Sequence, residues 1–166
     1  MMKNLLVAII WVTNSSVWAQ IEETENTIQE KEYLRFDLVE KIPLSPECEH
    51  YIDSSTALQQ ACFSEHMIKM VSSNYQYPKK ARKAGLSAKI YVNFIIEKDG
   101  SISNVEVLKG AGTKYENAPR KFRKMAKEMD NEAMRVIKLL KIASPGMQKG
   151  KAVRIQYCMP INLKLS

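Results

Sequence analysis

The chain has 166 residues, with 25 Lys and Arg against 18 Asp and Glu and a net charge of +7. This length is sufficient for one domain with a modest core and argues against two. The charge is unevenly divided, because residues 1–70 carry 5 basic and 11 acidic side chains and residues 71–166 carry 20 and 7. A basic domain behind an acidic lead segment favours a polyanionic partner or an interaction between the two halves, and a merely solvated surface is the alternative.

The first 19 residues have the pattern of a secretory signal peptide. Lys3 precedes an apolar run, Leu5–Val12, and the small-residue pattern Val17-Trp18-Ala19 comes before Gln20. We therefore predict cleavage between Ala19 and Gln20 and export of the remaining chain. An uncleaved anchor is the alternative, but a membrane span needs about 20 apolar residues, and this run stops at Thr13.

Export gives the cysteines a structural meaning. In an oxidising compartment Cys48 and Cys62 are most simply a disulfide, which stabilises the fold by roughly 3 kcal/mol. The alternative is a metal site completed by His50 and His66, but the spacing of the first Cys-His pair is unusual for zinc, so we predict none. Cys158 lies in a strand pattern and is expected to be a small buried residue.

The residues that follow the predicted signal peptide predict a tether and then a helix. Residues 20–47 are acidic and poor in apolar periodicity, which predicts a largely disordered tether, although the alternation over 34–39 indicates an added edge strand. Residues 56–72 are predicted to be a helix that begins with a capping box of Thr56 and Gln59. Its apolar stripe is Leu58, Cys62, Met67, Ile68 and Val71.

A block of ordered elements follows from Tyr77 to Leu165. Pro78 is placed at the start of a short helix, 79–84, which Gly85 ends. Residues 90–97 and 101–108 are rich in β-branched side chains and predict a hairpin that turns at Lys98-Asp99-Gly100.

The second half of the block predicts a loop, a helix and a last strand. Gly110-Ala111-Gly112 is expected to be a flexible turn, and 152–159 is expected to be the last strand, with Pro160 tolerated only at a bulge or an edge. Residues 119–140 predict a core-facing helix, with Met129-Asp130-Asn131 as a candidate break. Its apolar positions are Phe122, Met125, Met129, Ala133, Val136, Ile137 and Leu140.

The sequence carries no catalytic constellation. Its two histidines, His50 and His66, lie outside the block, and no Ser-His-acid arrangement, paired metal-binding His motif or Gly-rich phosphate loop is present. We therefore predict a binding protein without a cofactor, not an enzyme.

Five pieces of the block resemble, in order, the C-terminal domain of the TonB energy transducers. They are Tyr77-Pro78-x-x-Ala81-x-x-x-Gly85, Val92-x-Phe94-Ile95-Ile96-x-x-Asp99-Gly100-Ser101-Ile102, Asp130-x-Glu132-Ala133-x-Arg135-Val136, Pro145-Gly146-x-Gln148-x-Gly150-Lys151-x-Val153 and Pro160-Ile161-Asn162-Leu163. The segment of Cys48 and Cys62 also resembles the preceding helix of periplasmic members from Bacteroidetes-type bacteria. The resemblance implies an α+β fold over 48–166, a two-layer sandwich with helices on one face of a small three-stranded antiparallel sheet.

The resemblance also implies a place and a partner. The family domain lies in the periplasm and binds the TonB box, an extended segment of TonB-dependent outer-membrane receptors, as an added strand. We expect Arg154 and Gln156 to help select the guest, and other TonB-system components are further candidate partners. The predicted strand edge is Ala152, Val153, Arg154, Ile155, Gln156 and Tyr157. In the alternative, the tether or a second copy covers this edge, and the second copy would make a homodimer.

Three features depart from a full transducer. The predicted signal is cleavable where a transducer keeps a transmembrane helix, and residues 20–48 contain only Pro43 and Pro46 where a transducer has a long Pro-rich spacer. Lys141-Ile142-Ala143-Ser144 stands where the family usually has a Trp-containing turn. We therefore expect this chain to bind rather than to generate force alone.

The stretch 113–127 looks like a basic insertion in the family pattern. Its basic residues are Lys114, Arg120, Lys121, Arg123, Lys124 and Lys127. An exported protein seldom meets nucleic acid, so peptidoglycan or a membrane surface is the favoured polyanion. The same spacing is that of a helix's solvent face. The second hypothesis for function is an envelope structural protein that binds peptidoglycan or self-associates through the sheet edge.

Overall fold

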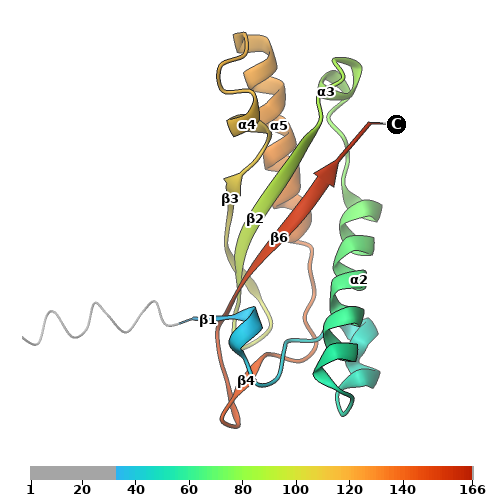
Figure 1. Cartoon of the computed structure of the whole chain (residues 1–166), viewed down its shortest axis with the longest axis vertical. Coiled ribbons are helices and arrows are strands. Elements are labelled where there is room, and N and C mark those ends of the chain that lie inside the picture. The colour runs from blue at the N-terminus through green and yellow to red at the C-terminus, as the bar shows by residue number, and fades with distance from the viewer. Residues whose placement is uncertain (1–32, 166) are drawn as a thin grey trace, which may run out of the picture. The chain divides into compact units, whose positions relative to one another are not determined.

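The computed structural model describes residues 33–165, which lie in one compact unit, Tyr33–Ser166 (Figure 1). The predicted signal peptide, its cleavage between Ala19 and Gln20, and residues 20–32 of the predicted tether lie outside the described residues. Within 33–165, no helix has both the length and the apolar character that a membrane crossing needs.

A four-stranded sheet with the order β1-β6-β2-β3 organises the unit. Its strands are β1 (Leu34–Arg35), β2 (Ala88–Ile96), β3 (Ile102–Lys109) and β6 (Ile155–Leu163). β2 pairs antiparallel with both β3 and β6, which confirms the predicted antiparallel sheet and its hairpin. β1 adds a short parallel pair at the outer side of β6. A separate small hairpin, β4 (Met147–Gln148) and β5 (Lys151–Ala152), precedes β6.

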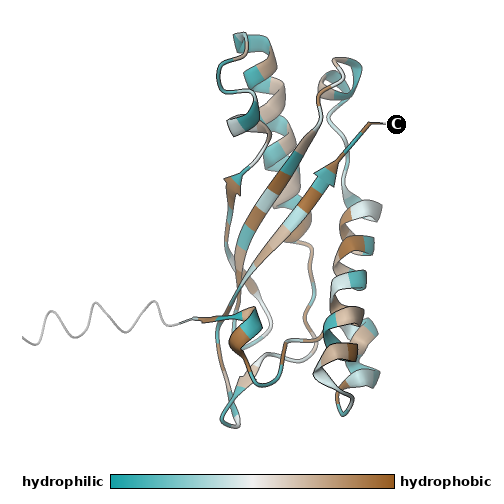
Figure 2. Cartoon of the chain, in the orientation of Figure 1, coloured by the Kyte–Doolittle hydropathy of each residue, from teal (hydrophilic) through white to brown (hydrophobic). Residues whose placement is uncertain are grey.

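Helices cover one face of this sheet. They are α2 (Thr56–Asn74), α3 (Lys79–Lys83), α4 (Ala111–Lys114) and α5 (Arg120–Ile137), with 3-10 turns η2 (Phe36–Leu38) and η3 (Pro46–Tyr51). Alternate residues of β2, such as Val92 and Phe94, are fully buried together with Met129 and Ile137 of α5. Hydrophobic residues accordingly mark β2 and β6, whereas α3 is hydrophilic (Figure 2). On the opposite side of β6, residues such as Cys158 and Pro160 are exposed, so the sheet is half-covered.

One carboxylate fixes the turn between β3 and α5. Asp130 accepts hydrogen bonds from the backbone N–H groups of Ala111 (2.8 Å) and Gly112 (2.7 Å). A Cβ at Gly110 would lie 2.3 Å from an oxygen of Asp130, so only glycine permits this approach. The segment predicted as a flexible turn is therefore the short helix α4. The predicted break at Met129-Asp130-Asn131 is also wrong, because α5 continues through it with Met129 buried and Asp130 engaged.

The start of α2 differs from the predicted capping box. The N-cap is Ser55, whose hydroxyl accepts the N–H of Leu58, and Gln59 instead donates to the carbonyls of Tyr51 and Ile52. The buried face of α2 consists of Gln59, Phe63, Met67 and Val71. Two members of the predicted stripe, Leu58 (52% exposed) and Ile68 (64%), lie on the outside, because the core takes its residues at intervals of four.

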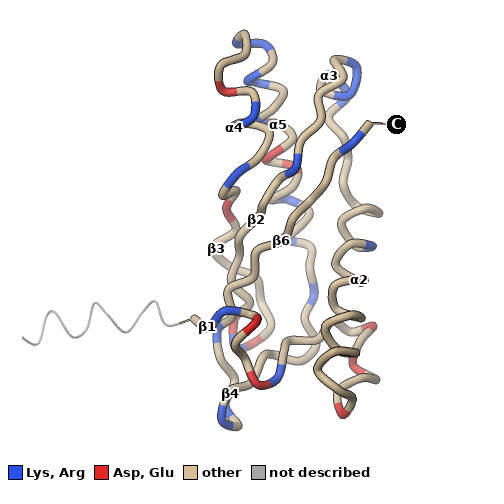
Figure 3. Tube along the Cα trace, in the orientation of Figure 1, with Lys and Arg blue, Asp and Glu red and all other residues tan. Residues whose placement is uncertain are grey.

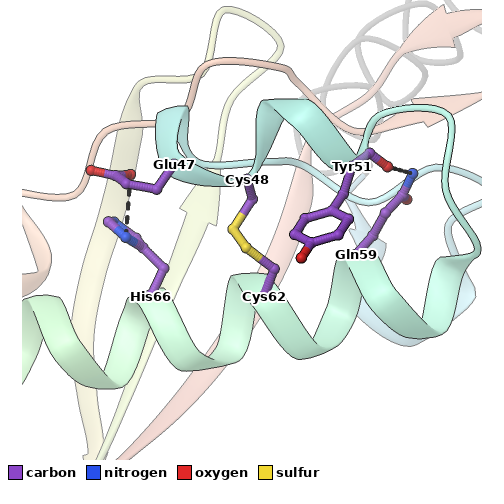
Figure 4. The surroundings of a disulfide bond; sticks show 6 residues. All are labelled: Glu47, Cys48, Tyr51, Gln59, Cys62 and His66. Atoms are coloured by element: carbon purple, nitrogen blue, oxygen red, sulfur yellow. Dashed lines mark hydrogen bonds and ion pairs between the residues drawn. A yellow bond between two sulfur atoms is a disulfide. The ribbon is translucent and has the colours of Figure 1, made fainter.

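The predicted disulfide between Cys48 and Cys62 is confirmed, and it joins η3 to α2 (Figure 4). An ion pair between His66 and Glu47 (3.2 Å) lies on one side of it and the Gln59 hydrogen bonds lie on the other. The disulfide occupies both thiols of the alternative metal site, and the described residues contain no cluster of three metal-binding side chains. The expectation for Cys158 is wrong, because its side chain is exposed on the uncovered sheet face.

The folded unit begins before the predicted boundary at residue 48. Val39, Ile42 and Leu44 are all buried in the core, at 8%, 3% and 2% exposure. Backbone hydrogen bonds join Lys41 to Met147 and Leu44 to Ser144. Residues 33–47 therefore differ from the predicted disordered tether. Their apolar side chains follow no regular period, because an irregular segment that crosses the core has no repeating face.

The disulfide provides a test of this packing. We expect Cys48→Ala/Cys62→Ala to lower the free energy of unfolding of the oxidised chain by about 3 kcal/mol, because the closed loop restricts the unfolded state. Urea denaturation followed by circular dichroism measures this. The matched control is Cys158→Ala, an exposed thiol, which is expected to change stability by less than about 0.5 kcal/mol. Equal losses in both variants would contradict the assignment.

Candidate functional site: the outer edge of strand β6

The six residues predicted as a free strand edge divide into three local arrangements. Ala152 lies in β5 and pairs with Met147 of β4. Val153 donates its N–H to the carbonyl of Gly146 at 3.0 Å. These two residues belong to the small hairpin and do not extend the edge of β6.

Arg154 is committed to the fold. Its guanidinium donates to both carboxylate oxygens of Glu97, at 2.8 and 3.0 Å, and its carbonyl accepts the N–H of Leu34 at 2.9 Å. The hydrogen bond from Arg154 holds the pKa of Glu97 below its usual value, with a further contribution from Ser103, against the effect of burial. The predicted role of Arg154 in selecting a guest remains a prediction.

Residues of the predicted tether cover the edge at Ile155 and Gln156. β1 pairs Leu34 with Ile155 and Arg35 with Gln156. The next side chain, Phe36, places its ring 5.3 Å from that of Phe63 in α2 and 4.7 Å from that of Tyr157. At these two positions the chain adopts the predicted alternative, an edge covered by its own N-terminal side. Phe36 fills the space between β6 and α2 at this end.

Beyond Gln156 the outer edge of β6 has no strand partner among the described residues. In an antiparallel pair, backbone groups alternate between facing the neighbour and facing away. Arg154 faces away from β2, because its carbonyl bonds to Leu34. By the same alternation Cys158, Pro160 and Asn162 present their backbone groups outward. Pro160 opposes Tyr91 across the ladder and, having no N–H, can sit here without loss to the sheet.

An apolar groove of about 380 Å³ borders this free edge. Its floor and one wall come from the last five residues of β6, and the other wall comes from the C-terminal half of α2 and the segment that follows. The lining residues are Ile68, Val71, Ser72, Tyr75, Tyr77, Met159, Pro160, Ile161, Asn162 and Leu163. The hydroxyl of Tyr75 donates to the carbonyl of Met129 at 3.1 Å, which ties this wall to α5. Burial raises the pKa of Tyr75, so the phenol stays protonated as a donor at neutral pH.

The sequence prediction pointed to this same strand, β6, and did not include the groove. The free part of the edge, from Cys158 to Leu163, lies just beyond the predicted Ala152 to Tyr157. Ile68 appears in the sequence as a core residue of α2, and its 64% exposure beside the edge is visible only in three dimensions. The motif Pro160-Ile161-Asn162-Leu163 was the available signal.

All six residues of the predicted basic patch are exposed. They belong to α4 and α5, and not to α2, which lines the groove. Lys114 belongs to α4 and donates to the carbonyl of Ser87 at 2.6 Å. The other five side chains occupy the solvent side of α5, opposite the buried Met125, Ala126 and Met129. They are Arg120, Lys121, Arg123, Lys124 and Lys127. These five residues therefore lie on the solvent face of a helix, as the predicted alternative states.

Comparisons with known proteins find a family match within the folded unit. Residues 73–127 match the family described as the Gram-negative bacterial TonB protein C-terminal. The chain is also similar to two NMR solution structures of the Helicobacter pylori TonB C-terminal domain. One has 21% identity, a TM-score of 0.41 and coverage of 74% of this chain and 94% of that chain. The other has 23% identity, a TM-score of 0.35 and coverage of 60% and 90%.

No curated protein matches the chain. The family match runs from the last residues of α2 through the β2–β3 hairpin into α5, and thus contains the Tyr77-Pro78 segment and the central strand of the sheet. Over residues 73–127 the chain is therefore similar to the TonB C-terminal domain family.

Proposed function

We propose that this protein is a periplasmic binding module of TonB-dependent transport that takes up an extended segment of an outer-membrane receptor as an added strand of its sheet. The observation that supports this most is the free outer edge of β6, from Cys158 to Leu163, directly beside an apolar groove. Unpaired backbone groups supply affinity in such binding, and pockets for alternate side chains supply specificity. β6 lies outside the matched residues 73–127, so the proposal depends on this geometry.

The chain contains an internal example of the proposed contact. β1 adds two residues to the outer side of β6, and Phe36 then enters the space between β6 and α2. A guest strand on the free part of the edge would repeat this arrangement further along. One set of its alternate side chains would enter the groove beside Ile68 and Tyr75, and the other set would lie over the exposed sheet face. The expected guest is therefore an extended segment with apolar residues at every second position.

The disulfide supports the proposed location. Cys48 and Cys62 form a disulfide. Disulfides persist in oxidising compartments such as the periplasm and are rare in the cytosol. Together with the TonB C-terminal family, this favours the periplasm.

The first test removes one donor from the edge. Asn162 faces outward, so Asn162→Pro is expected to delete its N–H without breaking the ladder to β2, as Pro160 already does. Peptides from the plug ends of TonB-dependent receptors, titrated by calorimetry, should bind the variant about two- to tenfold more weakly, the value of one hydrogen bond.

The control for this test is Asn162→Ala, which keeps the backbone N–H and should bind like the parent chain. If both variants bind the peptides equally weakly, the loss comes from the Asn162 side chain and not from its backbone N–H. A parent chain that binds none of the peptides would remove the proposed function altogether.

The second test concerns the groove. Ile68→Ser removes an exposed apolar side chain from the groove wall and should weaken peptide binding about three- to tenfold, because apolar area is no longer buried against the guest. Leu58→Ser is the matched control, since Leu58 is exposed on the same helix but does not line the groove. If Leu58→Ser weakens binding as much as Ile68→Ser does, the groove is not the guest's site.

A further inference from the structure

Basic side chains from four separate segments gather at one end of the folded unit, the end formed by α3, α4 and the start of α5 (Figure 3). We call this surface the basic end. It consists of Lys79, Lys80, Arg82, Lys83, Lys89, Lys109, Lys114, Arg120, Lys121, Arg123, Lys124, Lys127 and Lys164, all of them exposed. Only six of these residues belong to the basic stretch apparent in the sequence. The fold brings the others beside it.

These charges have almost no compensation within the fold. Residues 75–91 and 162–165 contain no Asp or Glu, and residues 109–128 contain only Glu116 and Glu128. The ion pairs among residues 33–165 join Arg35 to Asp37, His66 to Glu47, Arg135 to Glu132 and Arg154 to Glu97. None of them involves the basic end. A solvent face of ordinary composition intersperses both signs, so this concentration of a single sign favours an external polyanion.

The opposite end of the unit carries charges of both signs (Figure 3). Glu47 and Glu49 lie in η3, Asp53 in the turn before α2 and Glu65 in α2, whereas Lys149 and Lys151 lie at the hairpin of β4 and β5. A unit whose positive charge is concentrated at one end has a direction in an electric field. An anionic surface therefore attracts it and also orients it, with the basic end toward the surface.

We propose that the basic end is a docking surface for an anionic phospholipid bilayer. Ten of its thirteen residues are lysines, point charges on flexible stems, which suit a diffuse array of phosphates better than one bidentate ligand. The two nearby tyrosine rings are each covered by an ammonium group, Lys89 over Tyr91 at 5.1 Å and Lys114 over Tyr115 at 5.3 Å. These rings are therefore less available for stacking on the sugars of a glycan strand, which makes peptidoglycan the less favoured partner.

Docking through the basic end would place the groove close to the bilayer. Lys164 directly follows Leu163, which lines the groove, and α3 begins two residues after Tyr77, which lines its other wall. The inference does not depend on the proposed function. If both hold, the membrane surface presents the groove to segments that emerge from proteins in that membrane.

The test compares two variants of the full chain with the same change of net charge. Lys80→Glu/Arg82→Glu/Lys121→Glu/Arg123→Glu reverses four charges of the basic end, and Lys98→Glu/Lys138→Glu/Lys149→Glu/Lys151→Glu reverses four exposed lysines elsewhere. Partitioning is measured by co-sedimentation with vesicles of 30 mol% phosphatidylglycerol in phosphatidylcholine, and with pure phosphatidylcholine. The partitioning onto pure phosphatidylcholine is subtracted from the total. This removes any contribution from the apolar N-terminal residues, which are the same in all variants.

We expect the first variant to lose at least about a hundredfold of the partitioning that depends on phosphatidylglycerol, and the second to lose less than about fivefold. Raising the salt from 50 to 300 mM should weaken the parent chain at least about tenfold. Circular dichroism confirms that both variants are folded. Equal losses in both variants, partitioning that does not depend on phosphatidylglycerol, or binding to purified peptidoglycan but not to vesicles would overturn the inference.

Discussion

The antiparallel ladder between β2 and β6 is the constraint on which the rest of the structure depends. It pairs nine residues without interruption, from Ala88 opposite Leu163 to Ile96 opposite Ile155. Because the pairing has a period of two, this single register decides which side chains of β6 enter the core and which backbone groups face away from it. A shift by one residue would bury Pro160 and Asn162, expose Met159 and Ile161, and point the proline ring at β2.

Several elements could be predicted because their signals are local. The hairpin of β2 and β3 follows from β-branched residues on both sides of Asp99-Gly100, and α5 follows from apolar residues at helical spacing. The failures are contacts between segments distant in sequence. Asp130 looks like a break in a helix, yet its partners Ala111 and Gly112 lie in the preceding turn. Residues 33–47 look like a tether because their burial depends on α2 and on residues 144–147.

The candidate site was predictable only in part, for the same physical reason. The resemblance directed attention to the last strand, and the structure shifts the free part of its edge toward the C-terminus because β1 and the small hairpin occupy Ala152 to Gln156. The groove could not be predicted, because it depends on how α2 packs beside β6. The sequence pattern does not specify the distance between these two elements. The sequence showed only the part of the basic end that lies in the stretch 113–127. The fold places α3 and the ends of β2, β3 and β6 beside that stretch.

Pro160 has a consequence for the choice between a foreign strand and a second copy of this chain. In a pairing of two identical edges, each copy contributes a proline, so two acceptors lose their donors. A foreign strand without proline at that register loses only one. At about 1 kcal/mol for each missing bond, this single residue shifts the balance toward the mixed pairing by roughly fivefold. An edge can thus remain open to guests while being a poor partner for itself.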